Sequence, residues 1–363
     1  MFLRKLLLKN FRNFEEAQIE FCSGSNLIHG LNAQGKTNLL EAIYLLSTGR
    51  SFRTIHLQEL IQHGKPHFYI EAHFEKEGVP QDVSVFYDGM VKRVKHNQTT
   101  YSNFSQLLGL LPTVLYTPQD VALILGAPAI RRRFLDLHIA QVDQLYIHHL
   151  IRFYKALKQR NCLLRQKSEN GIEPWEHALA HSASYITEKR KTAVLELKAP
   201  LKKWMEHLSM QKEVLELHYL PSPCSAEIYA LERRRELHLG TTLFGPHRDD
   251  LEITIDTHNA KLFSSEGQKR CAISALRLAE WEHLKNLTGS PPLMSIDDFG
   301  MHLDESRQSL LQDQIQHLGQ VFITSPLGGE RLRAPVSIFV ENGKIGHARG
   351  HEHGHEIRKE KKP

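Results

Sequence analysis

The chain has 363 residues, of which 41% are hydrophobic and 24% charged, a balance typical of a soluble folded protein with room for two domains. No apolar run approaches the roughly 20 residues of a membrane span, and the short apolar start lacks the cleavage site of a signal peptide. We therefore expect a cytoplasmic protein without membrane contact. Its four cysteines lie far apart without a C-x-x-C pair, which favours neither disulfides nor a zinc site.

The net charge is only +5, but the basic surplus is concentrated in the middle of the chain. Residues 121–240 contain 19 Lys and Arg against 13 Asp and Glu, whereas the remainder contains 27 against 28. A basic surface attracts nucleic-acid phosphates, so this segment is the first candidate for such a contact. The surplus alone is weak evidence, because solvated charged helix faces are common.

Residues 1–120 show mixed strand and helix patterning, with turn residues between the apolar segments. Strands are expected at residues 5–8, 26–28, 68–74 and 83–87.

One octapeptide in this part of the chain, Gly-Leu-Asn-Ala-Gln-Gly-Lys-Thr at residues 30–37, fits the phosphate-binding loop pattern G-x-x-x-x-G-K-[ST] without a mismatch. An apolar strand precedes it and apolar residues at helical spacing follow it. This arrangement aims backbone N–H groups and a positive helix end at phosphate oxygens. The residues expected to bind nucleotide are Gly30, Leu31, Asn32, Ala33, Gln34, Gly35, Lys36 and Thr37. The alternative is a purely structural glycine turn.

The residue types of this loop each have a chemical role. Gly30 and Gly35 let the backbone approach the phosphates closely. Lys36 is expected to reach the β- and γ-phosphates and to serve catalysis as well as binding, and Thr37 to place its hydroxyl on Mg²⁺. The predicted cofactors are therefore ATP and Mg²⁺.

The middle of the chain reads as a helical hairpin. Apolar residues keep near-helical spacing from Pro128 to about Leu164, a turn follows at residues 168–174, and a second helix runs from Trp175 towards Leu197. Pro200 is expected to start or kink a third helix. The apolar stripes of these helices are expected to pack on one another.

After Gly240 the strand-like patterning returns, at residues 251–255, 293–296 and 320–324. The sequence thus predicts an α/β protein with a discontinuous ATPase lobe, residues 1–120 plus 241–345, interrupted by a helical arm at residues 121–240. The charged, His-rich tail at residues 346–363 is expected to be disordered, with metal binding by its histidines as the alternative.

The strand at residues 293–296 ends in two carboxylates, Asp297 and Asp298. In a P-loop NTPase an acidic residue at such a strand end holds Mg²⁺, which is the role expected of Asp297. Asp298 is expected to orient the water that attacks the γ-phosphate. Acidic strand ends are common, so this interpretation depends on the phosphate loop upstream.

The tetrapeptide Ser-Glu-Gly-Gln at residues 265–268 precedes a helix pattern and resembles the S-x-G-Q core of the ABC-type signature. Ser265, Gly267 and Gln268 are in register with that core. A small-residue turn before a helix is a second anion site, and one nucleotide is not easily gripped by both helix starts of the same subunit. We therefore expect an ATP-dependent homodimer. The alternative is a plain loop with a helix cap.

Four stretches make the resemblance more specific, and with them the whole of residues 1–345 resembles the RecF family, bacterial ATPases of recombination and gap repair related to SMC proteins. These stretches are residues 10–14 (Asn-Phe-Arg-Asn-Phe), 32–38, 131–136 (Arg-Arg-Arg-Phe-Leu-Asp) and 245–251 (Gly-Pro-His-Arg-Asp-Asp-Leu). The resemblance implies an ABC-type head with a short helical second lobe, and ATP-driven dimerisation on DNA with slow hydrolysis. It also implies action with RecO and RecR in loading the recombinase RecA at single-strand gaps.

The resemblance assigns further roles. Ser265 and Gly267 would contact the γ-phosphate of the partner's ATP, and Gln119 lies near the expected Q-loop position. Two departures from the pattern point to slow turnover. Residues 301–304 read Met-His-Leu-Asp where related ATPases have Ser-x-Leu-Asp, and Thr324 and Ser325 replace the histidine of the switch.

DNA contacts without sequence preference are expected from basic residues on or beside the helical arm, because phosphate contacts carry no base information. The candidates are Arg131, Arg132, Arg133, Lys155, Lys158, Arg160 and Arg165. A solvated helix face is the alternative for each of them, and ion pairs at the lobe interface are the alternative for Arg131, Arg132 and Arg133.

Other functions remain open from the residues alone. A small-molecule P-loop kinase would have no use for the tetrapeptide at residues 265–268. A non-hydrolysing ATP-binding scaffold is disfavoured by Asp297 and Asp298, and a transporter-associated ATPase fits the basic helical arm poorly. An ATPase of another SMC-like type is a further alternative.

Overall fold

The computed structural model describes residues 1–299, 305–326 and 334–346. Its first sheet is antiparallel, with strand order β2-β1-β4-β5-β6-β7. The strands are β1 (Phe2–Phe11), β2 (Phe14–Glu20), β4 (Phe68–Lys76), β5 (Val79–Tyr87), β6 (Lys92–His96) and β7 (Thr99–Tyr101). Burial alternates residue by residue along β4, as expected for a strand with one face on a core.

The second sheet, of order β15-β14-β3-β13-β12-β8, carries the motifs. Its members are β3 (Ser25–His29), β8 (Thr113–Tyr116), β12 (Leu293–Ile296), β13 (Val321–Ser325), β14 (Val336–Glu341) and β15 (Lys344–Gly346). All neighbouring pairs are parallel except β14 with β15. The two strands predicted after the helical arm in this sheet, residues 293–296 and 320–324, are present as β12 and β13.

Helix α1 (Lys36–Thr48) joins the two sheets into one core. Ten of its 13 residues are buried, and its Leu39, Leu40 and Ile43 share a hydrophobic cluster with side chains from both sheets. An apolar helix buried on most sides is a rigid support for whatever precedes its first turn. In this chain that is the phosphate loop.

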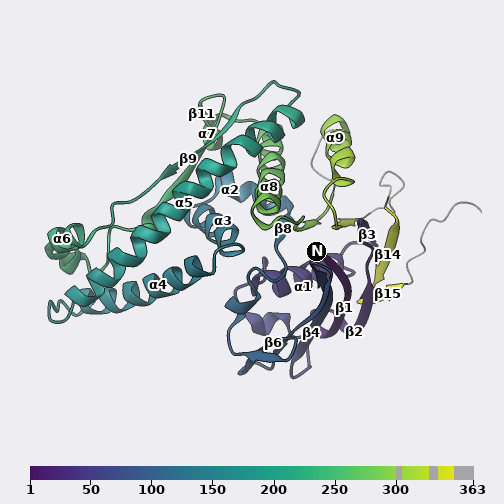
Figure 1. Ribbon diagram of the computed structural model, residues 1–363, viewed down its shortest axis with the longest axis horizontal. Coiled ribbons are helices and arrows are strands. Elements are labelled where there is room, and N and C mark those ends of the chain that lie inside the picture. Colours follow the sequence, from purple (N-terminus) through teal and green to yellow (C-terminus); the bar gives the residue numbers. More distant parts are fainter. Residues whose placement is uncertain (300–304, 327–333, 347–363) are drawn as a thin grey trace, which may run out of the picture.

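The middle of the chain forms the helical lobe, which extends to the left in Figure 1 with α6 near its end. Its helices are α2 (Ala122–Leu125), α3 (Pro128–Ala140), α4 (Gln144–Arg165), α5 (Glu173–Leu208) and α6 (Ala226–Leu239). The predicted helix from Pro128 to Leu164 is broken at residues 141–143, where Asp143 caps α4.

The third helix expected at Pro200 is wrong. Pro200 lies inside α5, which continues for 36 residues, or about 54 Å at 1.5 Å per residue. Leu197, Leu201 and Trp204 on either side of Pro200 are buried in the cluster around α8. This packing holds the helix together although one backbone N–H is missing.

A third, antiparallel sheet joins β9 (Leu215–Leu220) to β10 (Asp250–Ile255) and β11 (His258–Asn259). It crosses the predicted lobe boundary at residue 240, because the two strands on either side of that boundary share one ladder. The chain then continues through α7 (Ala260–Phe263), α8 (Glu266–Thr288) and, after β12, α9 (Glu305–Ile315). Short 3-10 turns lie at residues 57–60, 104–107, 118–121 and 246–248.

Two predicted features, residues 301–304 and the His-rich tail from residue 347, lie outside the described residues. Within the described ranges, no helix is both long and apolar enough to cross a membrane. All four cysteines are free thiols. No group of three or more His, Cys, Asp or Glu side chains suited to a metal ion occurs in the part of the chain that the structure describes.

Candidate nucleotide-binding site

Four predicted motifs meet at the carboxyl edge of the parallel sheet. The phosphate loop follows β3, Asp297 follows β12, and Thr324 is the next-to-last residue of β13. Thr117 and Gln119 follow β8 at the same edge. Ligands of open α/β sheets bind at this edge, where the loops after parallel strands converge. The topology therefore brings together residues that are up to 294 positions apart.

The glycines of the phosphate loop are required by space and by backbone conformation. Gly30 has φ of 150°, and a Cβ there would lie 2.2 Å from the carbonyl oxygen of Val340. Gly35 caps α1 with φ of 117°, and a Cβ there would lie 2.7 Å from the Asn13 side chain. Asn13 Nδ2 also donates to the Gln34 carbonyl oxygen at 2.7 Å. The loop is thus held closely against β14 and the start of the chain.

Lys36 is the buried cation of the site, with 5% of its surface exposed. Its Nζ donates to the carbonyl oxygens of Gly30 (2.7 Å) and Leu31 (2.9 Å), so it folds back over the loop. Within the described residues no carboxylate lies within ion-pair distance of it. Burial lowers the pKa of Lys36, and the charges of Asp298 and Asp297 oppose this shift. A buried ammonium bonded only to carbonyl oxygens is prepared to bind an anion.

The metal candidates are joined by direct hydrogen bonds. Thr37 Oγ1 donates to Asp297 Oδ1 at 3.1 Å, and Thr324 Oγ1 donates to the same oxygen at 2.7 Å. The backbone N–H of Asp298 donates to Thr324 Oγ1 at 2.8 Å. Thr324 therefore fixes both carboxylate residues in place. Asp298 itself has φ of 50°, a left-handed conformation that is uncommon outside glycine.

The electrostatics of this acidic pair favour a cation. Burial raises the pKa of Asp297, the neighbouring charge of Asp298 raises it further, and the hydrogen bonds from Thr324 and Thr37 act in the opposite direction. A hydroxyl and a carboxylate oxygen are hard ligands of the kind that Mg²⁺ prefers. Thr37 and Asp297 therefore fit a magnesium ion, whose charge would relieve the repulsion between the two carboxylates.

Gln119 lies in a separate turn beside the metal candidates. A cavity of about 470 Å³ between α1, α3 and α8 is lined by Thr37, Gln119 and Asp297 among other residues. Gln119 belongs to a 3-10 turn whose ends are fixed by a capping box between Thr117 and Asp120. Asp120 is held in turn by the partly buried Arg277 of α8 at 2.8 Å. The predicted Q-loop residue therefore faces the metal candidates across a hollow.

The signature candidate is a capped helix start, as expected. Ser265 is the N-cap of α8: its Oγ accepts from the Gln268 N–H at 3.2 Å, and Gln268 Oε1 accepts from the Ser265 N–H at 2.8 Å. The two hydrogen bonds of this capping box stay within the tetrapeptide and do not involve the phosphate loop. The phosphate contacts of Ser265, Gly267 and Gln268 therefore stay predictions.

The stretches at residues 131–136 and 245–251, which carried the family resemblance, contact each other. Arg131 pairs with Asp250 at 2.8 Å, and Arg132 Nη1 donates to the Asp249 carbonyl oxygen at 2.6 Å. Arg133 Nη2 donates to the Ser51 carbonyl oxygen at 3.3 Å, across to the lobe that contains α1. Arg131 thus forms an ion pair, as the alternative expected, whereas Arg132 and Arg133 bond to backbone carbonyl oxygens instead.

Sequence reasoning missed the arginine around which these motifs meet. Arg190 of α5 is completely buried and pairs with Asp136 and Asp249, each at 2.7 Å. It also donates to the Pro246 carbonyl oxygen at 2.7 Å. Its position was visible in the pattern, because it falls on the apolar stripe of its helix, four residues after Ile186 and four before Val194. An arginine on such a stripe predicts a buried ion pair.

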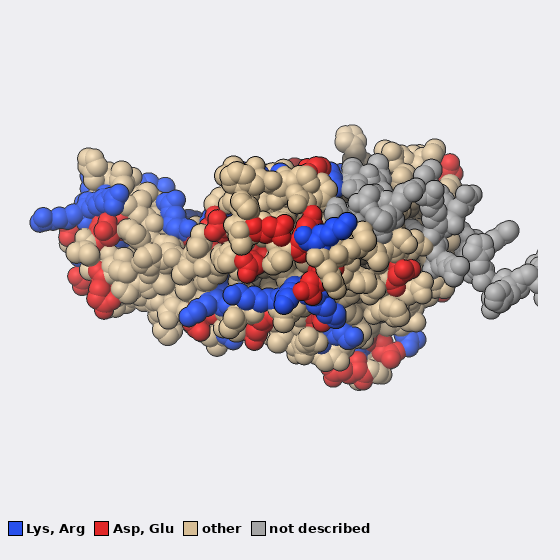
Figure 2. Space-filling model, turned by 90° about the horizontal axis from the view of Figure 1, so that it is seen from above, with Lys and Arg blue, Asp and Glu red and all other residues tan. Residues whose placement is uncertain are grey.

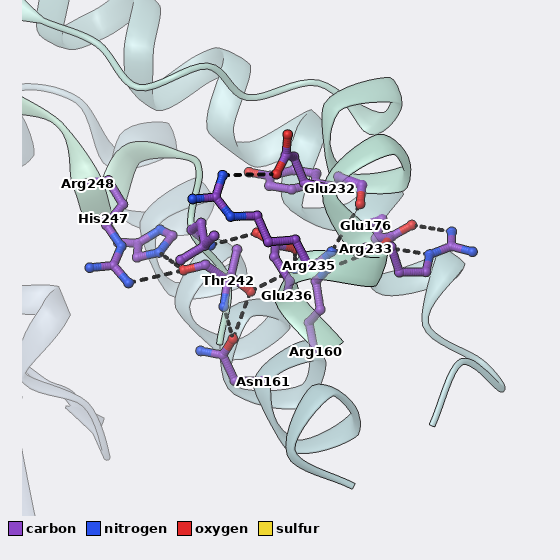
Figure 3. Close-up of polar contacts among 12 residues, drawn as sticks. Arg160, Asn161, Glu176, Glu232, Arg233, Arg235, Glu236, Thr242, His247 and Arg248 are labelled. Atoms are coloured by element: carbon purple, nitrogen blue, oxygen red, sulfur yellow. Dashed lines mark hydrogen bonds and ion pairs between the residues drawn. The ribbon is translucent and has the colours of Figure 1, made fainter. Parts of the chain in front are cut away.

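The remaining DNA candidates divide into exposed and buried residues. Lys155, Lys158 and Arg165 are exposed on α4. Arg160 is completely buried and pairs with Glu176 at 2.9 Å and Glu236 at 2.5 Å, as Figure 3 shows. The expected DNA contact of Arg160 is therefore wrong, because its guanidinium cannot reach solvent.

The surface charge does not by itself identify a DNA path. In Figure 2 the left end, which is the end of the helical lobe, carries both blue basic and red acidic side chains. The exposed lysines of α4 thus lie on a lobe of mixed charge.

Comparison with known proteins identifies the family of the chain. The family described as "RecF/RecN/SMC N terminal domain" matches residues 2–330. A DNA replication and repair protein RecF from Protochlamydia amoebophila is 44% identical, over 93% of this chain and 98% of its own length. A RecF from Chlamydia caviae is 41% identical over 90% of this chain and 92% of its own length. The chain belongs to the RecF family.

The solved structures agree with this membership in the RecF family. One described as RecF-ATP in the RecFOR pathway has a TM-score of 0.89 and 31% identity, covering 95% of this chain and 97% of its own. An Smc head domain from Pyrococcus furiosus has a TM-score of 0.59 at 17% identity, covering 96% of each chain, and shows the shared fold alone. The predicted ABC-type head with a helical second lobe is confirmed.

Proposed function

We propose that this chain is an ATP-dependent DNA-binding protein for recombinational repair at gaps and replication forks, acting in the cytoplasm. The observation that carries the proposal is Lys36, a buried cation bonded to two loop carbonyls next to the Thr37–Asp297 pair. This arrangement suits a triphosphate with its Mg²⁺. The solved relative described as RecF-ATP supports ATP as the nucleotide.

ATP would act as a clasp between two copies. The phosphate loop of one copy and the α8 start of the other each offer a helix N-terminus to the same phosphates. In this arrangement Ser265 and Gly267 complete a site that Lys36 begins, with Gln268 fixing the turn. The homodimer would exist only with ATP bound.

Hydrolysis of ATP would allow the dimer to dissociate. Asp298 lies beside Asp297 with its backbone fixed by Thr324, a position suited to orienting water on the γ-phosphate. Thr324 in place of an imidazole agrees with weak turnover, which DNA would stimulate. The Mg²⁺ ion held by Thr37 and Asp297 would stabilise the charge that develops on the phosphates.

DNA would be held through its backbone, at duplex and single-strand gap junctions, without sequence preference. Lys155 and Lys158 are exposed candidates, whereas Arg131, Arg132 and Arg133 are partly engaged in lobe contacts. By family membership, RecR and RecO would be partners in loading RecA, since the solved relative is assigned to the RecFOR pathway.

Sedimentation velocity tests the proposal. The protein is measured with ATP, ADP or no nucleotide, each with and without gapped duplex. The expected result is a dimer with ATP only, bound to the DNA. A monomer at saturating ATP would contradict the clasp, and ADP formation that depends on a metabolite and ignores DNA would indicate a small-molecule kinase.

The variant Asp298→Asn separates binding from hydrolysis. Asparagine tolerates the left-handed backbone at this position, so the fold is expected to be retained. ATP binding should persist, the dimer should become long-lived, and turnover should fall about 100-fold or more, in the range that general base groups contribute. Unchanged turnover would remove the role assigned to Asp298.

A further inference from the structure

Glu266 is a carboxylate at the centre of the predicted signature. It is the first residue of α8 and lies between Ser265 and Gly267. Consecutive Cα atoms are 3.8 Å apart, so its backbone adjoins both residues that are expected to contact phosphate. Its side chain is 58% exposed and is therefore not buried in its own subunit.

This position sets two electrostatic effects against each other. In the free chain, a carboxylate at a helix start is favourable, because it faces the positive end of the helix dipole. When the triphosphate of a second copy approaches the same helix start, the two negative charges repel. The same side chain thus stabilises the isolated subunit and opposes closing of the dimer.

Arg270 is placed to reduce this repulsion. It lies one helical turn after Glu266, and its Nη2 is 2.7 Å from Glu266 Oε1. The side chain of Arg270 is 20% exposed, so its charge is only partly screened by water. The pair carries no net charge at the helix start, whereas Glu266 alone would carry −1.

We infer that Glu266 acts as an electrostatic brake on ATP-driven dimerisation and that Arg270 releases part of it. This inference rests on the proposed ATP clasp. A brake of this kind explains why a helix start that is expected to bind phosphate carries an acidic residue together with a cation one turn later. Dimerisation is thereby kept weak enough to be reversed.

A purely structural role for Glu266 predicts the opposite sign. If Glu266 only stabilises the first turn of α8, its removal loosens the helix start and weakens the dimer. If Glu266 is a brake, removal of its charge tightens the dimer even though the free subunit becomes slightly less stable. The sign of the change in dimer affinity therefore decides between the two.

The test compares Glu266→Gln with the wild-type protein in sedimentation equilibrium, with ATPγS as the probe. Each dimer contains two composite sites, so an effect of about threefold per site gives about a tenfold tighter dimer, the size expected for charges several ångströms apart near water. Thermal unfolding without nucleotide is measured in parallel and should show no gain. An unchanged or weaker dimer would overturn the inference.

Two further measurements sharpen the result. Arg270→Ala should weaken the dimer in the wild-type background and have a smaller effect in the Glu266→Gln background. The advantage of Glu266→Gln should shrink as salt rises from 50 to 500 mM, because salt screens the repulsion. Equal effects of Arg270→Ala in both backgrounds would overturn the role of Arg270.

Glu227→Gln is the matched control. Glu227 lies in the first turn of α6, after the N-cap Ser225, in the helical lobe. Its removal should not change the dimer affinity, and an equal gain would show that the effect is not specific to the signature. Failure of the proposed function is distinguishable, since wild-type protein that stays monomeric with ATPγS contradicts the clasp, whereas a wild-type dimer unaffected by Glu266→Gln contradicts only the brake.

Discussion

Lys36 in the phosphate loop and Arg160 in the helical lobe are both buried cations, but their surroundings are opposite. Arg160 is paired with Glu176 and Glu236, two carboxylates that are themselves buried. Among the residues that the structure describes, the hydrogen-bond partners of Lys36 Nζ are the carbonyl oxygens of Gly30 and Leu31. A cation whose charge is already neutralised holds helices together, whereas one that is not neutralised is available to a ligand. The contrast separates the structural from the functional charges of this chain.

The largest effect is expected from Arg160→Met. It removes the cation paired with the buried Glu236 and one of the two arginines on Glu176, which keeps Arg233 at 2.7 Å, and should lower the free energy of unfolding by about 3–5 kcal/mol. Urea unfolding followed by circular dichroism measures this change. Arg165→Met, on the exposed face of the same helix, is the control and should stay within about 0.5 kcal/mol. Loss of DNA affinity without loss of stability would contradict the structural role.

Lys36→Met should impair ATP binding rather than stability, the reverse of what is expected for Arg160→Met. ATP affinity, measured by calorimetry, is expected to fall at least about 100-fold, as for loss of a charge-assisted contact worth some 3 kcal/mol. Stability without nucleotide should change far less than in Arg160→Met, because burial already disfavours the charge of Lys36. An ATP affinity within about tenfold of the wild-type value would contradict the role assigned to Lys36.

The double variant Lys155→Ala, Lys158→Ala tests the exposed cations of the helical lobe. If both contact phosphates, DNA affinity should fall several-fold for every sequence, and the slope of log affinity against log salt should decrease by about 1–2. Lys203→Ala is the control, because Lys203 is exposed on α5 but pairs with Glu282 at 2.8 Å. An unchanged salt slope would exclude phosphate contacts by these lysines.

The smallest effect is expected from Asp297→Asn without ligand. The pKa of Asp297 is raised in the folded protein by burial and by Asp298. Its ionised form therefore costs stability at neutral pH, and this cost disappears as pH falls below the ordinary carboxyl value of about 3.9. The variant should melt slightly higher than wild type at pH 7 and equally at low pH. A lower melting temperature at pH 7 would contradict this sign.

Much of the site was predictable from local sequence. The phosphate loop, the acidic strand end and the signature each lie where their pattern placed them, because a strand-turn-helix needs only neighbouring residues. The contacts that hold the loop were not predictable in this way. Asn13 and Asn342 both bond to Gln34, and the second of these contacts joins residues 308 positions apart. No periodicity in the sequence indicates such a pairing.

The wrong predictions for the helical lobe can be explained from the sequence. Arg160 was counted among the DNA candidates by charge alone, although Phe153, Leu157 and Leu164 place it on the buried stripe of α4. Strand β9 was missed within a segment treated as helical, although residues 215–220 alternate apolar and polar side chains up to His218. Pro200 was given too much weight, because packing on α8 holds α5 continuous.

The most direct test of the account is a mixing experiment with two variants, each defective in one half of the composite site. Lys36→Ala removes the phosphate loop cation, and Ser265→Asp keeps a good N-cap while placing a negative charge at the phosphate contact. Alone, neither should dimerise with ATP.

Mixed in equal amounts, the two variants should form a heterodimer that holds one ATP between the intact Lys36 of one chain and the intact Ser265 of the other. Light scattering with ATP binding measured on the same sample would show this. A mixture that remains monomeric with ATP would contradict the claim that two copies share each nucleotide.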